Sequence, residues 1–261
     1  MRIAVLLKQV PDIVEELEIA PDGKDLARDD LKYRLNEFDD YALEEALQLK
    51  GALKGAGTEV VALALDGEEA DLILYTALAK GADRVLKITG APADARTARA
   101  GVAMFAEALR PLAPDLVLAG VQAPDDLEGQ LAPLVGAALG FPHVNVVTGL
   151  AIDGATARLT QEFSGGLVAH LEADLPLVVG VQASREAPRY AAITRVRQAM
   201  TSGKLETVAV AAAIGGPGPE LRGLAKPEAT THAEMIDGSV DEAASRLAAI
   251  LRERGFGGAK G

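Results

Sequence analysis

Cysteine and tryptophan are absent from this 261-residue chain, and histidine occurs only three times. Without cysteine there is no disulfide, no thiolate nucleophile, and no zinc or iron–sulfur centre with cysteine ligands. His143, His170 and His232 are scattered along the sequence, and none has a second histidine four residues away. We therefore interpret each as structural and expect neither a metal site nor a catalytic histidine.

Positive charge and long apolar runs are also scarce. The chain has 26 Lys and Arg against 38 Asp and Glu, a net charge of −12. This balance argues against nucleic acids and anionic membrane surfaces, because both are bound through clustered Lys and Arg. No apolar run approaches the roughly 18 residues of a transmembrane helix. The apolar N-terminal run is too short for a signal peptide, so we expect a soluble, cytoplasmic protein.

The sequence contains no recognisable catalytic motif. Gly-x-Ser-x-Gly, His-Glu-x-x-His, the Walker pattern and Gly-x-Gly-x-x-Gly are all missing. The acidic pairs Asp39-Asp40 and Glu44-Glu45 fall in a helical pattern, where adjacent residues point in different directions. We interpret them as a solvated helix face with a cap, in which Asn36 and Asp39 form a capping-box-like pair. No catalytic residue is predicted.

What the chain does contain, up to about residue 145, is an alternation of short apolar runs with helical segments. Strands are expected at 3–7, 59–65, 84–88 and 116–119, and helices at 36–53, 68–80, 93–109 and 129–139. Repeated β-α units of about 25–30 residues predict an α/β fold of the Rossmann-like kind. It would have an open, mostly parallel sheet with helices on both faces.

The pattern changes after residue 144. Strands at 144–152, 156–163, 167–172 and 177–182 are expected to extend the sheet as antiparallel or mixed strands, followed by a helix at 190–200 and a strand at 207–210. Residues 215–231 are rich in Pro and Gly, and 240–254 read as an amphipathic helix. We predict a nucleotide-binding domain at 1–212 and a C-terminal arm and helix at 213–261 that packs on its own domain or on a partner.

The stretch from Leu118 to Leu131 is the main candidate for a binding site. It leads from a strand through glycine into a helix N-terminus, where free backbone N–H groups favour a phosphate. The segments 8–12, 65–67 and 36–39 could complete the walls of an adenine-nucleotide pocket. We expect Gly129 and Gln130 nearest the phosphate, with the carboxylates turned toward ribose or solvent. Those carboxylates are Asp125, Asp126 and Glu128.

Several segments, taken in order, resemble one family. They are Val5-Leu-Leu-Lys-Gln-Val-Pro-Asp12, Asn36-Glu-Phe-Asp-Asp-Tyr-Ala-Leu-Glu-Glu-Ala46, Thr76-Ala-Leu-Ala-Lys-Gly-Ala-Asp83, Gly120-Val-Gln-Ala-Pro-Asp125 with Gly129-Gln130, and Ala187-Pro-Arg-Tyr190. Over roughly residues 1–210 the chain is similar to the β subunit of electron transfer flavoprotein.

The resemblance implies a heterodimer with an α subunit that holds FAD, an AMP in the β subunit, and a C-terminal arm that wraps the partner. The implied nucleotide residues are Leu6, Asn36, Glu37, Phe38, Asp39, Leu65, Gly120, Val121, Gln122, Ala123, Asp125, Asp126, Glu128, Gly129, Gln130 and Leu131. Ile13 and Phe38 would lie near the flavin edge. The segment 181–190 would dock onto dehydrogenases, through Ser184, Arg185, Glu186, Pro188, Arg189 and Tyr190.

On this reading the chain is an electron-carrier subunit that accepts electrons from dehydrogenases and passes them to a downstream acceptor. Its cofactor does the redox chemistry. One alternative is the bifurcating subclass, with a second FAD and NADH oxidation. Another is a stand-alone adenine-nucleotide-binding module, and a third is a purely structural partner without nucleotide.

Overall fold

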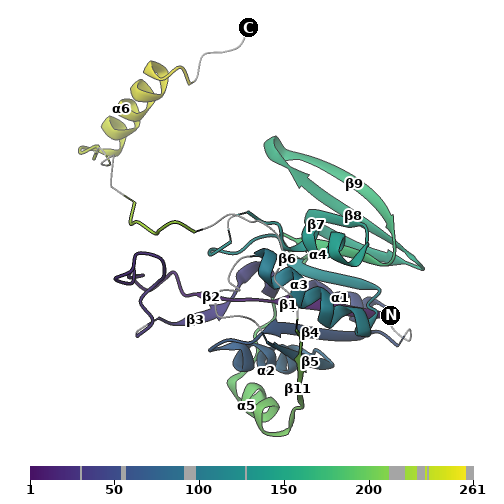
Figure 1. The fold of residues 1–261 in the computed structure, drawn as a ribbon. Coiled ribbons are helices and arrows are strands. Elements are labelled where there is room, and N and C mark those ends of the chain that lie inside the picture. Colours follow the sequence, from purple (N-terminus) through teal and green to yellow (C-terminus); the bar gives the residue numbers. More distant parts are fainter. Residues whose placement is uncertain are drawn as a thin grey trace. The chain divides into compact units, whose positions relative to one another are not determined.

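The computed structural model (Figure 1) describes residues 1–29, 31–53, 57–90, 98–126, 128–211, 221–227, 233 and 235–256, with the backbone alone at 98–100. The chain forms two compact units, Met1–Arg222 and Gly223–Gly261. The predicted domain boundary at 212–213 lies outside the described residues.

The larger unit is built on a nine-stranded sheet in the order β11-β5-β4-β1-β6-β10-β7-β8-β9. The strands from β11 to β7 are parallel; β8 then pairs antiparallel with β7, and β9 pairs antiparallel with β8. Their bounds are β1 Arg2–Leu7, β4 Glu59–Leu65, β5 Arg84–Thr89, β6 Leu116–Gly120, β7 His143–Asp153, β8 Thr156–Phe163, β9 Leu167–Asp174, β10 Leu177–Val181 and β11 Leu205–Ala209. The predicted α/β, Rossmann-like fold class is therefore confirmed.

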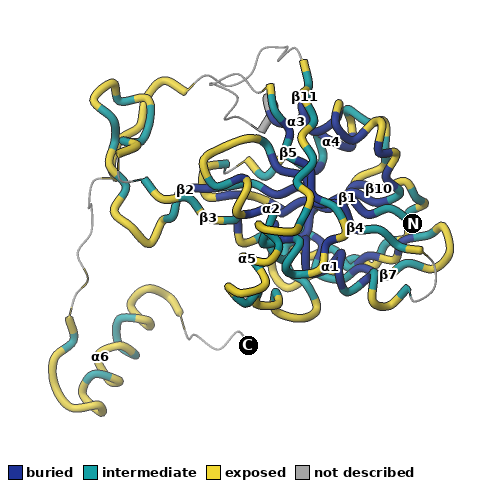
Figure 2. Tube along the Cα trace, turned by 90° about the horizontal axis from the view of Figure 1, so that it is seen from below, coloured by how far each residue is buried: buried dark blue, intermediate teal, exposed yellow. Residues whose placement is uncertain are grey.

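Helices cover both faces of the sheet and enclose a separate hydrophobic core on each. Helices α1 (Glu37–Ala52) and α2 (Ala70–Lys80) share one core cluster, and α3 (Ala98–Leu109) and α4 (Leu131–Leu139) share the other. β1 shows why both form: Ile3 and Val5 belong to the first cluster and Ala4 and Leu6 to the second. The central parallel strands β4, β1, β6 and β10 are therefore buried on both faces, whereas the edge strand β11 is teal and yellow in Figure 2.

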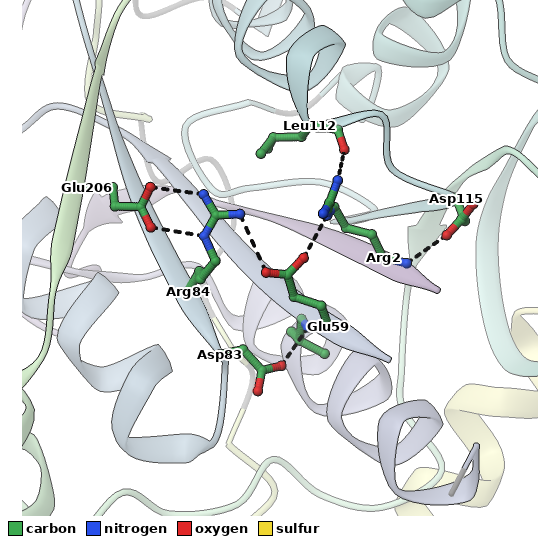
Figure 3. Close-up of polar contacts among 8 residues, drawn as sticks. Arg2, Glu59, Asp83, Arg84, Leu112, Asp115 and Glu206 are labelled. Atoms are coloured by element: carbon green, nitrogen blue, oxygen red, sulfur yellow. Dashed lines mark hydrogen bonds and ion pairs between the residues drawn. The ribbon is translucent and has the colours of Figure 1, made fainter. Parts of the chain in front are cut away.

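The amino-terminal edge of the sheet carries charges of alternating sign on neighbouring strands (Figure 3). Glu206 on β11 binds Arg84 on β5 with two hydrogen bonds of 2.9 Å, and Arg84 also lies 3.5 Å from Glu59 on β4. Glu59 accepts a 2.7 Å bond from Arg2 on β1, whose backbone N–H donates to Asp115 just before β6. Each strand start is thus paired with an opposite charge on its neighbour, which favours this strand order.

Two predictions about the strands need correction. The segment 177–182 was expected to extend the sheet with its neighbours. Instead β10 is a fully buried parallel strand inserted between β6 and β7, and its four apolar side chains pack into the two cores. A short antiparallel pair, β2 (Gln9–Pro11) with β3 (Tyr33–Leu35), was not predicted at all. Strands of three residues carry too little periodicity to be recognised.

The segment after β10 returns to the far edge of the sheet. Helix α5 (Ile193–Ser202) starts three residues later than expected and packs on α2, and β11 then pairs with β5. The helix predicted at 93–109 corresponds to α3, but its predicted start falls in 91–97, which lie outside the described residues. No helix in the described ranges is long and apolar enough to cross a bilayer.

In the smaller unit the described structure is mainly helix α6 (Val240–Glu253), as predicted from its periodicity. Ser239 and Glu242 form a reciprocal capping box at its start. Its apolar positions Val240, Leu247 and Leu251 are 85%, 50% and 43% exposed. A helix with an exposed apolar stripe is typical of a segment that packs on another surface.

Arg84→Gln should lower the free energy of unfolding by about 1 kcal/mol, since it removes two partly exposed ion pairs. Arg84 holds the pKa of Glu206 below its ordinary value, so this contribution is present at neutral pH and lost as the pH falls through the acidic range. Urea unfolding measures the change, and hydrogen exchange should be faster in β11. Arg158→Gln is the matched control, because Arg158 also pairs with two acids but all three side chains are at least 60% exposed. Equal losses in both variants would contradict a special role for the network.

Candidate functional site

A small pocket lies where β1 and β6 end, at the carboxyl edge of the sheet. Sheet order diverges here, because β1 is followed along the chain by β4 on one side, while β6 lies on its other side. Such a switch point is the usual ligand position in open α/β sheets. The pocket is lined by Lys8, Asn36, Asp39, Gly120, Val121, Gln122, Ala123, Asp126 and Leu131, and its free volume is only about 10 Å³.

The carboxylate of Asp39 joins the two strand ends beneath this pocket. It accepts a 2.7 Å hydrogen bond from the backbone N–H of Gly120, at the end of β6, and one of 2.8 Å from that of Lys8, just after β1. Burial raises the pKa of Asp39 to about 7, although these two amides, Asn36 and the Lys8 ammonium act in the opposite direction. Asp39 thus connects the start of α1 to both strands.

Glycine is required at position 120 by this close approach. A Cβ there would lie 2.5 Å from Asp39 Oδ1 and 2.7 Å from Phe38 Cβ. Both distances are shorter than any real Cβ contact, so a larger residue would push the first turn of α1 away from β6.

The predicted capping box at the start of α1 is wrong. Asn36 occupies the N-cap position, but its side chain makes no cap hydrogen bond. Instead its Nδ2 donates to the carbonyl of Gln122 at 2.9 Å, and its Oδ1 is buried without a partner among the described residues. The tertiary position of the loop after β6 outcompetes the local cap. An unpartnered buried oxygen in a pocket wall is able to accept a bond from a ligand hydroxyl or amine.

Lys8 belongs to the segment 8–12 that was predicted as one wall of the pocket, but no role was predicted for its positive charge. Its ammonium lies 2.7 Å from a carboxylate oxygen of Asp125, and it lines the same pocket as Gly120 and Leu131. The loop itself has no Lys or Arg, so its charge was expected to be negative only. The signal was its position: Lys8 directly follows the first strand, whose carboxyl end had to lie beside the loop.

The phosphate end of the predicted site is formed by Gly129 and the start of α4. Gly129 has φ +59°, and a Cβ on it would lie 2.9 Å from the carbonyl of Val121. Its carbonyl accepts a 3.1 Å bond from Asn145 Nδ2, a support from β7 that sequence reasoning missed. Leu131 and Ala132 begin α4, where backbone N–H groups have no intrahelical acceptor.

The remaining predicted nucleotide residues are dispersed around the pocket rather than in its wall. Leu6 is buried in the core, and Leu65 packs against the same core. Glu37, Glu128 and Gln130 are exposed, and Phe38 is half-buried beside Gly120. No group of three His, Asp or Glu side chains that could hold a metal occurs within the ranges the structure covers.

The interpretation of Glu44-Glu45 as part of a solvated helix face is wrong. Both side chains are nearly inaccessible, at 3% and 2% exposure, because the segment after β10 lies over α1. Glu44 accepts three hydrogen bonds from Arg189, and Glu45 lies 3.6 Å from Arg185. These long-range partners have no signature in the local helix pattern.

The segment Ser184–Tyr190, called here the docking loop, follows β10 and combines fixed charges with exposed apolar side chains. Ser184 and Glu186 are linked by a hydroxyl-to-carbonyl bond within the loop. Tyr190 is 83% exposed, and Ile193, which begins α5 and was not predicted as a site residue, is 61% exposed. Near the β2–β3 hairpin, Ile13 is also 61% exposed. Exposed Tyr and Ile beside arginines are typical of protein-docking surfaces.

The fold and pocket together define a Rossmann-like α/β protein with a pocket at the switch point of its sheet, and comparison with known proteins gives its family. A family model described as "Electron transfer flavoprotein domain" matches residues 24–213. Electron transfer flavoprotein subunit beta of Methylophilus methylotrophus is 32% identical over 262 residues, with 97% of this chain and 98% of the relative covered. The human subunit is 32% identical, with 80% and 81% covered, and that of Syntrophomonas wolfei 34%, with 97% and 96% covered.

The chain therefore belongs to the electron transfer flavoprotein β-subunit family, in agreement with the resemblance found in the sequence. It is a member of a family of electron carriers that work with flavin.

Gly120→Ala should destabilise the larger unit by about 1–3 kcal/mol, because the added methyl group overlaps Asp39 and Phe38. Urea unfolding of the variant gives the value. Gly51→Ala is the matched control: it lies in the same helix as Asp39, a Cβ meets nothing within 4 Å, and it should be neutral or stabilising by up to about 1 kcal/mol. A neutral Gly120→Ala would contradict the close approach of β6 and α1.

Asp39 should make the protein less stable as the pH rises from 3.8, its ordinary pKa, to about 7, its pKa in the fold. In that range the unfolded chain loses the proton that the folded chain keeps, so the free energy of unfolding falls by up to about 1.4 kcal/mol per pH unit. The loss is complete above the folded pKa. The free energy of unfolding, measured by urea at several pH values from 4 to 8, should therefore fall more steeply with pH in the natural protein than in Asp39→Asn. Identical slopes would assign the pH dependence to other groups.

Proposed function

We propose that this chain is the β subunit of a heterodimeric, cytoplasmic electron transfer flavoprotein, and that it binds AMP in the pocket between β1 and β6. With its α partner it would hold an FAD, accept electrons from dehydrogenases and pass them to a downstream acceptor. The observation that carries the proposal is the pocket itself: a switch-point site with amide donors, one unpartnered buried oxygen and one lysine.

The residues of the pocket fit an adenine nucleotide in chemical type. The free N–H groups at the start of α4 and the Lys8 ammonium suit a phosphate, and the Asn36 oxygen suits a ribose hydroxyl or adenine amine. The free volume of about 10 Å³ is far smaller than a nucleotide. Binding would therefore require the loop that ends at Leu131 to move outward and the Lys8–Asp125 pair to open.

The proposed AMP is structural rather than reactive. A ligand that binds only the folded chain stabilises it by mass action, and a site of this kind needs no general acid or base. When bound with the α partner, FAD would supply the electron storage. The part of this chain proposed to lie near the flavin edge is the exposed Ile13 beside the β2–β3 hairpin, together with Phe38 at the start of α1.

The docking loop and the C-terminal unit are the proposed contact regions. We assign the loop, with Arg185, Arg189 and Tyr190, to dehydrogenases that donate electrons. We assign the arm and α6, from 213 to 261, to the α partner. Support comes from the exposed apolar groups in each: Tyr190 in the loop, and Val240 and Leu247 on α6.

The cofactor inventory of the purified complex tests the proposal. The chain is co-expressed with its α partner, the complex is denatured, and the released cofactors are separated by chromatography and identified by absorbance. We expect one FAD and one AMP per heterodimer, with flavin bands in the visible spectrum. Two FAD and no AMP would show the bifurcating type. A copurifying pair without flavin, or ATP turnover by the isolated chain, would overturn the carrier assignment.

A further inference from the structure

Two adjacent acids on α1 hold the two arginines of the docking loop, but they hold them differently. Glu44 and Glu45 are both almost fully buried. Adjacent helical positions point about 100° apart, so the two carboxylates meet separate parts of the loop. Arg189 is the partner of Glu44, and Arg185 is the partner of Glu45.

The pair of Glu44 and Arg189 is closed and complete. Arg189 donates from its Nε and Nη2 at 2.8 Å and from its backbone N–H at 3.0 Å. Burial alone would raise the pKa of Glu44, but these bonds bring it below its ordinary value. Removal of either partner would leave a buried group unpaired, so this contact is the permanent attachment of the loop.

The pair of Glu45 and Arg185 is open and incomplete. Its shortest separation is 3.6 Å, and neither carboxylate oxygen of Glu45 has a hydrogen bond among the described residues. Arg185 instead donates to the carbonyl of Leu150 at 3.2 Å, and 51% of its side chain is exposed. The guanidinium is therefore in reach of a second carboxylate from outside.

The surroundings of Glu45 make it ready to lose its partner. Burial raises the pKa of Glu45, Arg185 opposes this, and the neighbouring Glu44 adds to it. Arg185 and Glu44 are the charged groups that face it; the strands packed against α1 contribute apolar side chains to the adjacent core, such as Val147 and Val181. A carboxylate in this setting becomes neutral by taking a proton once the arginine leaves.

We propose that Glu45 is a positioning residue for docking: it holds Arg185 against the domain until an acidic side chain of a protein partner takes that arginine. This rests on the proposed role of the docking loop. An acidic partner fits the charge of the exposed Arg185 guanidinium, which has only a 3.6 Å contact with Glu45 and one hydrogen bond to a backbone carbonyl. Arg195 and Arg197, on the helix that follows the loop, are exposed as well. Arg185 would exchange a long, unbonded contact for a charge-assisted hydrogen bond, and Glu45 would take up one proton.

The test uses the full chain in complex with its α partner and hexaglutamate as the acidic probe. Arginine Nε–Hε resonances report binding in NMR titrations that start at pH 8 and continue into the acidic range. We expect Arg185 to shift on titration and its affinity for hexaglutamate to increase as the pH falls, since protonation of Glu45 releases it. In Glu45→Gln the affinity at pH 8 should be up to about fivefold higher and independent of pH. The same affinity and the same pH profile in both proteins would overturn the proposal.

Two further variants make the result decisive. Glu45→Met replaces the carboxylate with an apolar side chain of similar size and should behave like Glu45→Gln, even if the buried amide impairs folding. Arg185→Gln, made in the natural protein or in Glu45→Gln, should abolish the pH-dependent part of hexaglutamate binding. Any pH-dependent binding that persists would come from other arginines and would overturn the proposal.

Electron transfer from dehydrogenases is a separate measurement. Rates unaffected by Arg185→Gln would refute the docking role of the loop, whereas the hexaglutamate titration alone decides whether Glu45 holds Arg185.

Discussion

The buried carboxylate of Asp39 is the interaction on which the arrangement of the site depends. It accepts backbone hydrogen bonds from Lys8 and Gly120, so one side chain from α1 fixes the ends of two parallel strands. Burial of a charged carboxylate is expensive, and the amides that the strands leave free offset this cost only in part, since the pKa of Asp39 is still raised to about 7. The pocket, the lysine beside it and the glycine that permits the contact all follow from this one attachment.

Helix α1 then connects the pocket to the docking loop. Its first turn carries Asp39, and its second carries Glu44, which binds Arg189 of the loop. Both contacts are buried and lie on one regular helix, so the two regions keep a fixed separation. For an electron carrier this is a useful constraint, because a bound nucleotide that stabilises the start of α1 also stabilises the helix on which the loop is mounted.

The amino-terminal and carboxyl-terminal ends of the strands differ in how completely their polar groups are paired. At the amino edge, the alternating charges from Glu206 to Asp115 pair every neighbouring strand from β11 to β6 (Figure 3). At the carboxyl edge, the polar groups are incompletely paired: the Asn36 oxygen has no partner among the described residues, and Lys8 has only the exposed Asp125. Polar groups that are fully paired stabilise the sheet, whereas polar groups that are incompletely paired are available to bind a ligand.

The sequence by itself determined the repeated β-α units, the two-faced burial of the parallel strands and the family, because hydrophobic periodicity and the ordered motifs are local properties. It also placed the loop from Gly120 to Leu131 at a parallel strand end and added the helix start from Asn36 to Asp39 as a further wall of the same predicted site. Only the tertiary structure decided that Glu44 and Glu45 are buried, that Lys8 pairs with Asp125 at the pocket and that β10 is central. The charge pairs join residues more than 100 positions apart, and β10 pairs with strands that do not adjoin it in the sequence. A charge that is neutralised by so distant a partner has the same local sequence pattern as a charge in water.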